Sequence, residues 1–240
     1  MIKKEIVIAG KRCFVFADEE PEVLLLEPMD LRDLDFLDKE IETLKAGTAR
    51  PFALATLIIE DWNKELAPWA SEPVFGKDPF GDGASETLRL IEEELVPEME
   101  GLFPTLKGAE KILGGYSLAA LFALWCAYES PSFTGIAAAS PSVWYPGWMD
   151  FVRSHTPHVG TIYLSLGDKE YKSKNKTMAT VEDCIRAYAD ILSASGLVET
   201  TLEWNPGNHF VDADKRTAKA FLWVMMQPDN LSLCLFMNKS

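Results

Sequence analysis

From residue 52 onward, the chain alternates between short apolar stretches and longer segments with helical periodicity. Residues 52–59 (FALATLII) form an unbroken apolar run, which is typical of a strand buried on both faces of a sheet. Further strands are predicted at 111–114, 135–139, 161–166 and 199–204, and helices at 85–100, 117–128, 178–194 and 214–226. This order predicts an α/β fold with right-handed crossovers, a mostly parallel central sheet and helices on both faces.

The N-terminal part has a different pattern. Three short strands are expected at 2–8, 11–17 and 22–27, with turn and charge signals but no helix between them, so they predict an antiparallel edge of the sheet. A helix is expected at 31–45, and Gly47 follows it as a stop signal. Ser85 is predicted to cap the later helix at 85–100, whose acidic first turn suits the positive end of a helix.

Size and charge narrow the class of protein. The chain has 240 residues and is 48% hydrophobic, which predicts a single domain spanning residues 1–240 around one core. The formal net charge of −14 repels phosphate backbones and anionic lipid, so nucleic acid and membrane surfaces are not expected as partners. No apolar run approaches the length of a membrane span, and no signal peptide is read from the N-terminal residues.

The four cysteines are scattered along the chain and show no metal-binding spacing. We therefore expect free thiols, a reducing cytoplasmic environment, and no metal or other cofactor. The histidines and acids also lack an HxH or HExxH arrangement, which makes a metal-dependent hydrolase a poor interpretation.

Candidate functional residues follow the predicted strands. In a parallel sheet, chemistry is concentrated at the carboxyl ends of the strands. Ser117 follows the strand at 111–114, Asp168 and Glu170 follow the strand at 161–166, and His209 follows the strand at 199–204. A serine, two acids and a histidine are thus expected at one edge of the sheet.

Ser117 stands at the joint between a strand and an apolar helix, in KILGGYSLAALFALW. Gly115 and Ala119 are small, as a sharp strand-to-helix turn around a nucleophilic serine requires. Such a turn would place the N–H of Leu118 where it can stabilise an oxyanion. The alternative is that Ser117 only fills a tight turn, but the order of the remaining site residues favours a nucleophile.

His209 is the predicted general base, because it lies in the last loop before the final helix. His155 and His158 lie in a proline-containing connection and are interpreted as surface residues. Glu170 is the preferred acid because it lies far enough past Gly167 to turn back over the sheet edge. Asp168 remains the alternative acid.

A long loop at 60–85, rich in proline, glycine and tryptophan, follows the strand at 52–59. The N–H of Trp62 in this loop is the predicted second oxyanion donor. Trp69, Tyr116 and Trp144 are predicted to line a substrate pocket. For the loop tryptophans, packing of the loop itself is an equally good interpretation.

Five motifs keep a common order along the chain: GDGASETLRLIEEELVP (81–97), GGYSLAALFALW (114–125), ASPSVWY (139–145), LSLGDKE with its lysine-rich loop (164–176) and NPGNHFVDADKRTAKAF (205–221). In these motifs the chain resembles the esterase family of the α/β-hydrolase fold, which includes esterase D and the enterochelin-esterase-like enzymes. The resemblance implies hydrolysis of a small carboxylic ester through an acyl-serine, without a metal. It assigns Ser117 as nucleophile, His209 as base and Glu170 as acid, and a chain this compact leaves no room for a large lid.

Other functions stay open at this point. One is a non-catalytic α/β-hydrolase-fold binding protein. Another is acyl transfer, thioester hydrolysis or peptide hydrolysis by the same three residues. The sequence does not identify the ester or the oligomeric state.

Overall fold

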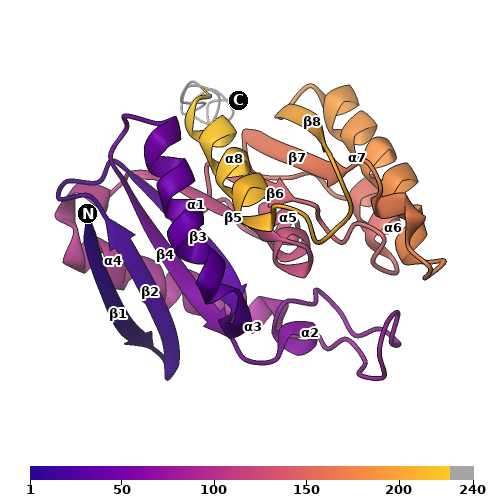
Figure 1. Ribbon diagram of the computed structural model, residues 1–240, viewed down its shortest axis with the longest axis horizontal. Coiled ribbons are helices and arrows are strands. Elements are labelled where there is room, and N and C mark those ends of the chain that lie inside the picture. The colour runs from indigo at the N-terminus through magenta and orange to yellow at the C-terminus, as the bar shows by residue number, and fades with distance from the viewer. Residues whose placement is uncertain (228–240) are drawn as a thin grey trace.

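The computed structural model describes residues 1–227 (Figure 1). In this part of the chain the strands join one eight-stranded sheet in the order β1-β2-β4-β3-β5-β6-β7-β8. The tail, with Cys234 and its LSLCLF stretch, lies outside the described residues. The strands are β1 (Ile2–Ile8), β2 (Lys11–Ala17), β3 (Val23–Asp30), β4 (Phe52–Ile59), β5 (Glu110–Tyr116), β6 (Gly135–Ala139), β7 (Thr161–Gly167) and β8 (Glu199–Asn205).

The antiparallel edge and the parallel centre are both confirmed. β1 pairs with β2, and β2 with β4, in antiparallel fashion, whereas all pairs from β4 to β8 across the sheet are parallel. The third early strand differs from the prediction, because β3 lies inside the parallel part, between β4 and β5. The helix that follows it provides the crossover that a parallel β3–β4 pair needs.

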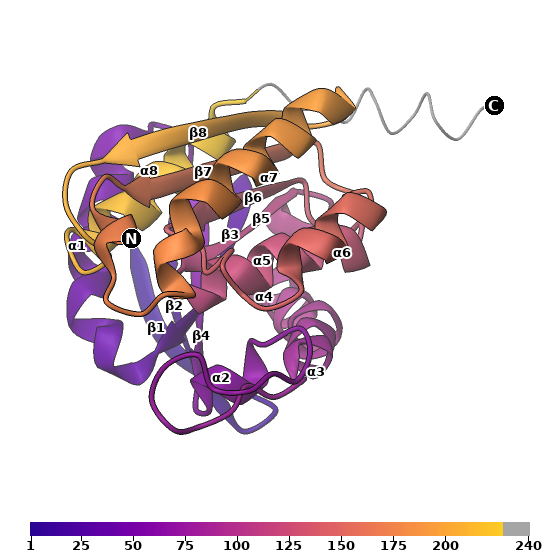
Figure 2. The same cartoon turned by 90° about the vertical axis from the view of Figure 1, so that its right-hand side faces the viewer.

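Helices cover both faces of the sheet. Figure 2 shows α1 and α8 on one side of the sheet and α5 and α6 on the other. The main helices are α1 (Leu34–Gly47), α3 (Ala84–Leu90), α4 (Val96–Leu102), α5 (Leu118–Glu129), α6 (Trp148–Ser154), α7 (Val181–Ser195) and α8 (Ala213–Met225). Two buried apolar clusters result, one on each face of the sheet.

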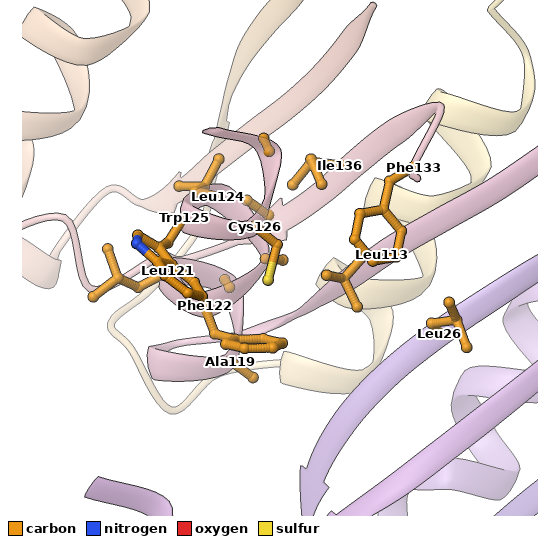
Figure 3. Packing of buried hydrophobic residues seen from close by; sticks show 14 of the residues in the cluster. Leu26, Leu113, Ala119, Leu121, Phe122, Leu124, Trp125, Cys126, Phe133 and Ile136 are labelled. Carbon is orange, nitrogen blue, oxygen red and sulfur yellow. The ribbon is translucent and has the colours of Figure 1, made fainter. Parts of the chain in front are cut away.

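α5 is the most buried helix. Every residue from Leu118 to Tyr128 is buried, which explains why its sequence is apolar on all sides. Figure 3 shows its side chains next to Leu113 of β5 and Ile136 of β6. Despite this composition, none of the described helices is both long and apolar enough to cross a membrane. α5 therefore fixes the end of β5, where Ser117 lies, from within the core.

The helix predicted at 85–100 begins differently from the prediction. Gly83 is the N-cap of α3, with no side-chain cap bond, so Ser85 lies inside the first turn and the predicted Ser85 cap is wrong. A Cβ at Gly83 would come within 2.7 Å of the carbonyl oxygen of Lys64, so the close approach of the preceding loop selects glycine here. A π-helical turn at Ile91–Leu95 joins α3 to α4.

The loop at 60–83 contains structure that the sequence did not predict. α2 (Trp62–Glu65) begins immediately after β4, with the Asp61 side chain accepting a hydrogen bond from the N–H of Lys64. Ser71 and Phe80 then form an isolated antiparallel bridge. Trp62 therefore lies close to the end of β4, and the end of the loop returns to α2, where the N–H of Gly83 donates to the carbonyl oxygen of Lys64 at 2.8 Å.

Candidate active site

Ser117 lies on a strained turn between β5 and α5, with φ 59° and ψ −118°. A non-glycine residue in this region of backbone space costs roughly 1–3 kcal/mol and persists only where its surroundings enforce it. Gly115 has φ +157°, and a Cβ there would come within 2.8 Å of the Ala119 Cβ. The two small residues around the serine therefore let β5 and α5 approach closely, as the elbow pattern predicts.

His209 connects the serine to an acid. Its Nε2 lies 3.0 Å from the Ser117 Oγ, and its Nδ1 lies 2.7 Å from Glu170 Oε2. The three residues follow β5, β7 and β8, so they reach one another only because these strands end at the same edge of the sheet. The His209 side chain is 24% exposed and that of Glu170 is 4% exposed, so the histidine faces the opening and the acid is held behind it.

Glu170 is fixed by several donors. Its Oε1 accepts hydrogen bonds from the Gly167 N–H at 2.7 Å, the Ser140 hydroxyl at 2.8 Å and Arg216 Nη1 at 3.2 Å. Burial raises the pKa of this carboxyl, but the bonds from His209, Gly167 and Ser140 outweigh burial, and the pKa is lowered overall. Glu170 is therefore a carboxylate whose second oxygen is free to hold His209.

Arg216 is a buried residue of α8 that sequence reasoning missed. Its side chain is only 3% exposed, and its Nη2 donates to the carbonyl oxygens of Pro206 at 2.9 Å and Asn208 at 3.2 Å. Nη1 also donates to the Tyr116 hydroxyl, which in turn donates to the carbonyl oxygen of His209 at 2.8 Å. Arg216 thus ties the loop that carries the histidine to the loop that carries the acid.

Asp168, the alternative acid, does not contact His209. Its Oδ1 accepts the N–H of Gly207 at 2.7 Å, so it fastens the turn that precedes the histidine. The other two histidines lie elsewhere: the ring of His155 stacks on Phe151, and the backbone of His158 bonds to Ala127. Among the described residues, no group of three or more histidines, cysteines, aspartates or glutamates could hold a metal.

Both predicted oxyanion donors are the first residues of helices. Leu118 begins α5 and Trp62 begins α2. Backbone N–H groups in the first turn of a helix have no partner within that helix, so they are available to bind an oxygen. Trp62 and Ser117 also line the same cavity, and Leu118 directly follows Ser117 in the chain.

A cavity of about 760 Å³ opens in front of the serine, and we call it the Ser117 cavity. It is lined by the end of β3, the start of α1 and the start of α8, together with Trp62, Tyr116, Ser117 and His209. Trp69 and Trp144 do not line it. Trp69 Nε1 donates to the carbonyl of Pro146 at 2.8 Å, and both tryptophan rings pack in an aromatic cluster with Tyr145. The predicted pocket role of these two tryptophans is thus not supported by this cavity, and they pack the long loop.

A family model described as "Putative esterase" matches residues 43–219. The chain belongs to this esterase family. The matched region contains Ser117, Glu170 and His209, and the described fold is that of an α/β-hydrolase. No curated protein matches the chain.

Several solved structures share the fold of this esterase. An IroE-like serine hydrolase from Shewanella oneidensis has a TM-score of 0.72 at 14% identity, with 92% of this chain and 79% of that chain covered. The siderophore hydrolase EstA from Aspergillus nidulans has a TM-score of 0.68 at 18% identity, with 95% of each chain covered. The enterobactin esterase from Shigella flexneri has a TM-score of 0.66 at 14% identity, with 93% of this chain and 59% of that chain covered. At these identities the similarity establishes the fold alone.

Proposed function

We propose that this esterase hydrolyses carboxylic esters of small molecules through an acyl-serine intermediate on Ser117. The observation that carries the proposal is the unbroken set of contacts from the Ser117 Oγ to His209 at 3.0 Å and from His209 to Glu170 at 2.7 Å. A serine on a strained turn, a base in reach of its hydroxyl and a buried carboxylate behind the base are the parts that acyl transfer needs.

The reaction begins when His209 Nε2 accepts the proton of the Ser117 hydroxyl as Oγ attacks the ester carbonyl carbon. The N–H groups of Leu118 and Trp62 then bind the oxyanion. The imidazolium gives its proton to the leaving alcohol oxygen, and the acyl group stays on Ser117. His209 next takes a proton from water, whose oxygen attacks the acyl carbon. Return of the proton to Ser117 Oγ releases the acid.

Glu170 and Arg216 act behind the base. Glu170 accepts the Nδ1–H of His209, which leaves Nε2 unprotonated toward Ser117 and stabilises the imidazolium when it forms. Arg216 touches neither the serine nor the imidazole ring, so it is a positioning residue that holds Glu170 and the loop of His209 in register.

The alternatives use the same site. A purely binding function has no need for the Ser117–His209 hydrogen bond or for the strained turn that presents the hydroxyl. Acyl transfer to another acceptor, and hydrolysis of thioesters or peptides, would use the same triad and differ in what enters the Ser117 cavity. A cytoplasmic location stays a prediction of the sequence.

The test is hydrolysis of p-nitrophenyl butyrate together with labelling by a fluorophosphonate probe. Ser117→Ala is expected to lose labelling completely and to lose turnover by on the order of 10⁶-fold, because the nucleophile is gone. Ser85→Ala is the matched control, since Ser85 is exposed and makes no cap bond. Full turnover by Ser117→Ala would overturn the proposal, and a folded wild type that neither labels nor turns over would favour the binding function.

A further inference from the structure

The Ser117 cavity forms where two neighbouring strands separate. The parallel pairing of β3 with β5 ends at Leu26 and Leu113, yet β3 stays paired with β4 as far as Asp30. β5 meanwhile stays paired with β6 as far as Tyr116. Pro28 fits the segment of β3 that has lost its partner, because proline has no N–H to donate to a ladder. The last residues of β3 therefore line the Ser117 cavity.

Two buried glutamates lie in this opening. Glu27 of β3 follows Leu25 and precedes Met29 on the face of the sheet that α1 and α8 cover. Glu40 of α1 belongs to the buried stripe of that helix, which also contains Leu37. Glu27 is 3% exposed and Glu40 is 2% exposed. Both line the Ser117 cavity, so a carboxyl pair is set into an apolar core next to the proposed nucleophile.

The two carboxyls have each other as partner and no one else. Glu27 Oε2 and Glu40 Oε1 are buried, and among residues 1–227 neither accepts a hydrogen bond from outside the pair. A hydrogen bond joins the two side chains, which requires a proton on one of them. A buried carboxyl pair that is bonded only to itself is costly, and native proteins rarely contain one. Both residues line the Ser117 cavity, so a ligand that donates hydrogen bonds can bind the pair by inserting its donor between the two carboxyls in place of the shared proton.

The pKa values of Glu27 and Glu40 also indicate that the empty pair holds a proton. Burial raises the pKa of Glu27 to about 8, and its interaction with Glu40 offsets part of that effect. Burial also raises the pKa of Glu40 well above its usual range, and the charges of Glu27 and Asp214 add to the shift. The empty pair therefore keeps a proton at neutral pH, and a cation between the two carboxyls would take over the role of that proton.

The rim of the Ser117 cavity, like the carboxyl pair, has more acidic than basic residues. Asp30, Asp33, Asp212 and Asp214 line it together with the basic residues Arg32, Lys39 and Lys215. Two of these three cations are already bound, Arg32 to Asp30 at 2.6 Å and Lys215 to Asp212 at 3.1 Å. Four acids against three bases leave the rim with a single excess negative charge, which favours a cation slightly over an anion.

The carboxyl pair and the reacting atoms share one cavity. Glu27 and Glu40 line the Ser117 cavity together with Ser117 and His209. A substrate bound in this cavity can therefore contact the carboxyl pair and the proposed nucleophile at the same time.

We propose that Glu27 and Glu40 bind a primary ammonium group carried by the acyl part of the substrate, so that this esterase prefers esters of cationic acids. The proposal rests on the proposed ester hydrolysis for its biological meaning, but the cation site itself is a property of the cavity. The observations that carry it are a buried carboxyl pair with no hydrogen-bond partner outside the pair and the place of both residues in the wall of the Ser117 cavity.

The first experiment measures binding without catalysis. Ser117→Ala is titrated with hexylamine and with 1-hexanol by calorimetry near pH 8. Hexylamine is expected to bind at least about tenfold more tightly, because hydrogen bonds between charged groups are the stronger kind. Adding Glu27→Gln or Glu40→Gln, each an isosteric change, should remove that difference. Equal binding of the two probes, or an unchanged difference in both glutamine variants, overturns the proposal.

The second experiment measures preference. The kcat/KM of Nα-acetyl-lysine methyl ester is compared with that of Nα-acetyl-norleucine methyl ester, which lacks only the amine. A preference of about tenfold or more is expected in the wild type and should fall within about threefold in Glu27→Gln and Glu40→Gln. Glu94→Gln, which changes an exposed acid outside the Ser117 cavity, should keep the preference.

The two readouts separate the two proposals. If hexylamine binds through Glu27 and Glu40 but neither ester is hydrolysed, the cation site stands and the proposed hydrolysis fails. If both esters are hydrolysed at equal rates and hexylamine binds no better than 1-hexanol, the hydrolysis stands and the cation site is wrong.

Discussion

Two acids that are two residues apart in the sequence have different environments. Glu170 is buried against His209, Ser140 and the Gly167 N–H, whereas Asp168 is exposed and holds only a turn. The sequence favoured Glu170 because it lies farther past the end of the strand, and the geometry of the site agrees with that choice. What distinguishes the two is the set of donors around each carboxyl, which comes from three separate loops.

This difference gives a prediction for the acid. Glu170→Gln should lower kcat for p-nitrophenyl butyrate by on the order of 10³–10⁴, because an amide cannot hold the required tautomer of His209. Asp168→Asn should change kcat by less than about tenfold, since the amide oxygen can still accept the Gly207 N–H. Steady-state kinetics of the two variants measures both losses of kcat. A larger loss in Asp168→Asn than in Glu170→Gln would identify Asp168 as the acid instead.

At the level of elements, α8 does more than cover the sheet. Through Arg216 it binds both the acid and the loop that carries the histidine, with Glu170 3.2 Å away and two carbonyl oxygens of that loop as further partners. Breaking a buried ion pair by removing one member leaves an uncompensated charge. The orientation of the site therefore depends on a helix that contributes no catalytic group.

We expect Arg216→Met to lower the free energy of unfolding by about 3–5 kcal/mol in urea denaturation. Because Arg216 and Glu170 are in contact, Arg216→Met combined with Glu170→Gln should lose less than the sum of the single losses. Arg153→Met removes an exposed ion pair with Asp150 and should cost less than about 1 kcal/mol. If the loss in the free energy of unfolding in the double variant equals the sum of the losses in Arg216→Met and Glu170→Gln, the Arg216–Glu170 contact contributes little to stability.

Element by element, the sequence was most informative where hydrophobic patterning decides the structure. The strands at 52–59 and 135–139 have the predicted bounds, because continuous apolar runs end sharply at polar residues. The prediction of Ser85 as the cap was wrong because the close approach of Lys64 requires glycine at position 83, which is the N-cap. This contact comes from the preceding loop, and no local sequence pattern indicates it. α2 and α6 were not predicted because each is too short to show a period.

The site was predicted in outline but not in depth. Ser117, His209 and Glu170 could be placed because each follows a recognisable strand. The buried position of Arg216 could not be predicted, since an arginine in a helix is normally exposed to solvent. Glu40 has a weak sequence signal: it is three residues after Leu37 and four before Leu44, on the buried side of α1. Its partner on β3 appears only when the topology brings α1 over that strand.

On the scale of the whole molecule, the Ser117 cavity lies between two sets of elements, those with the proposed catalytic residues and those with the proposed cation site. The triad comes from loops after β5, β7 and β8, whereas the Glu27–Glu40 pair comes from β3 and α1. The separation of β3 from β5 places both on one opening. The proposed catalytic centre and the proposed cation site therefore come from different elements of the fold, so a substitution in one does not directly change a residue of the other.

The carboxyl pair also predicts how stability depends on pH. A glutamate in the unfolded chain has an ordinary pKa near 4.5, whereas burial raises the pKa of Glu27 to about 8 and that of Glu40 well above its usual range. Between these values the native state holds protons that the unfolded state has released, so the free energy of unfolding must fall as pH rises. The slope contributed by one such proton is about 1.4 kcal/mol per pH unit.

Urea denaturation between about pH 5 and pH 8 tests this slope. The wild type is expected to lose stability steadily across the range, and Glu27→Gln and Glu40→Gln should each flatten the loss, because glutamine carries no proton to release. Glu94→Gln should leave the slope unchanged, which separates the pair from the general self-repulsion of a chain with a net charge of −14. Hexylamine should restore more stability at pH 8 than at pH 5, since a bound cation compensates the charge that ionisation of the pair creates. A wild-type stability that rises over this range would mean that the two carboxyls are ionised when empty.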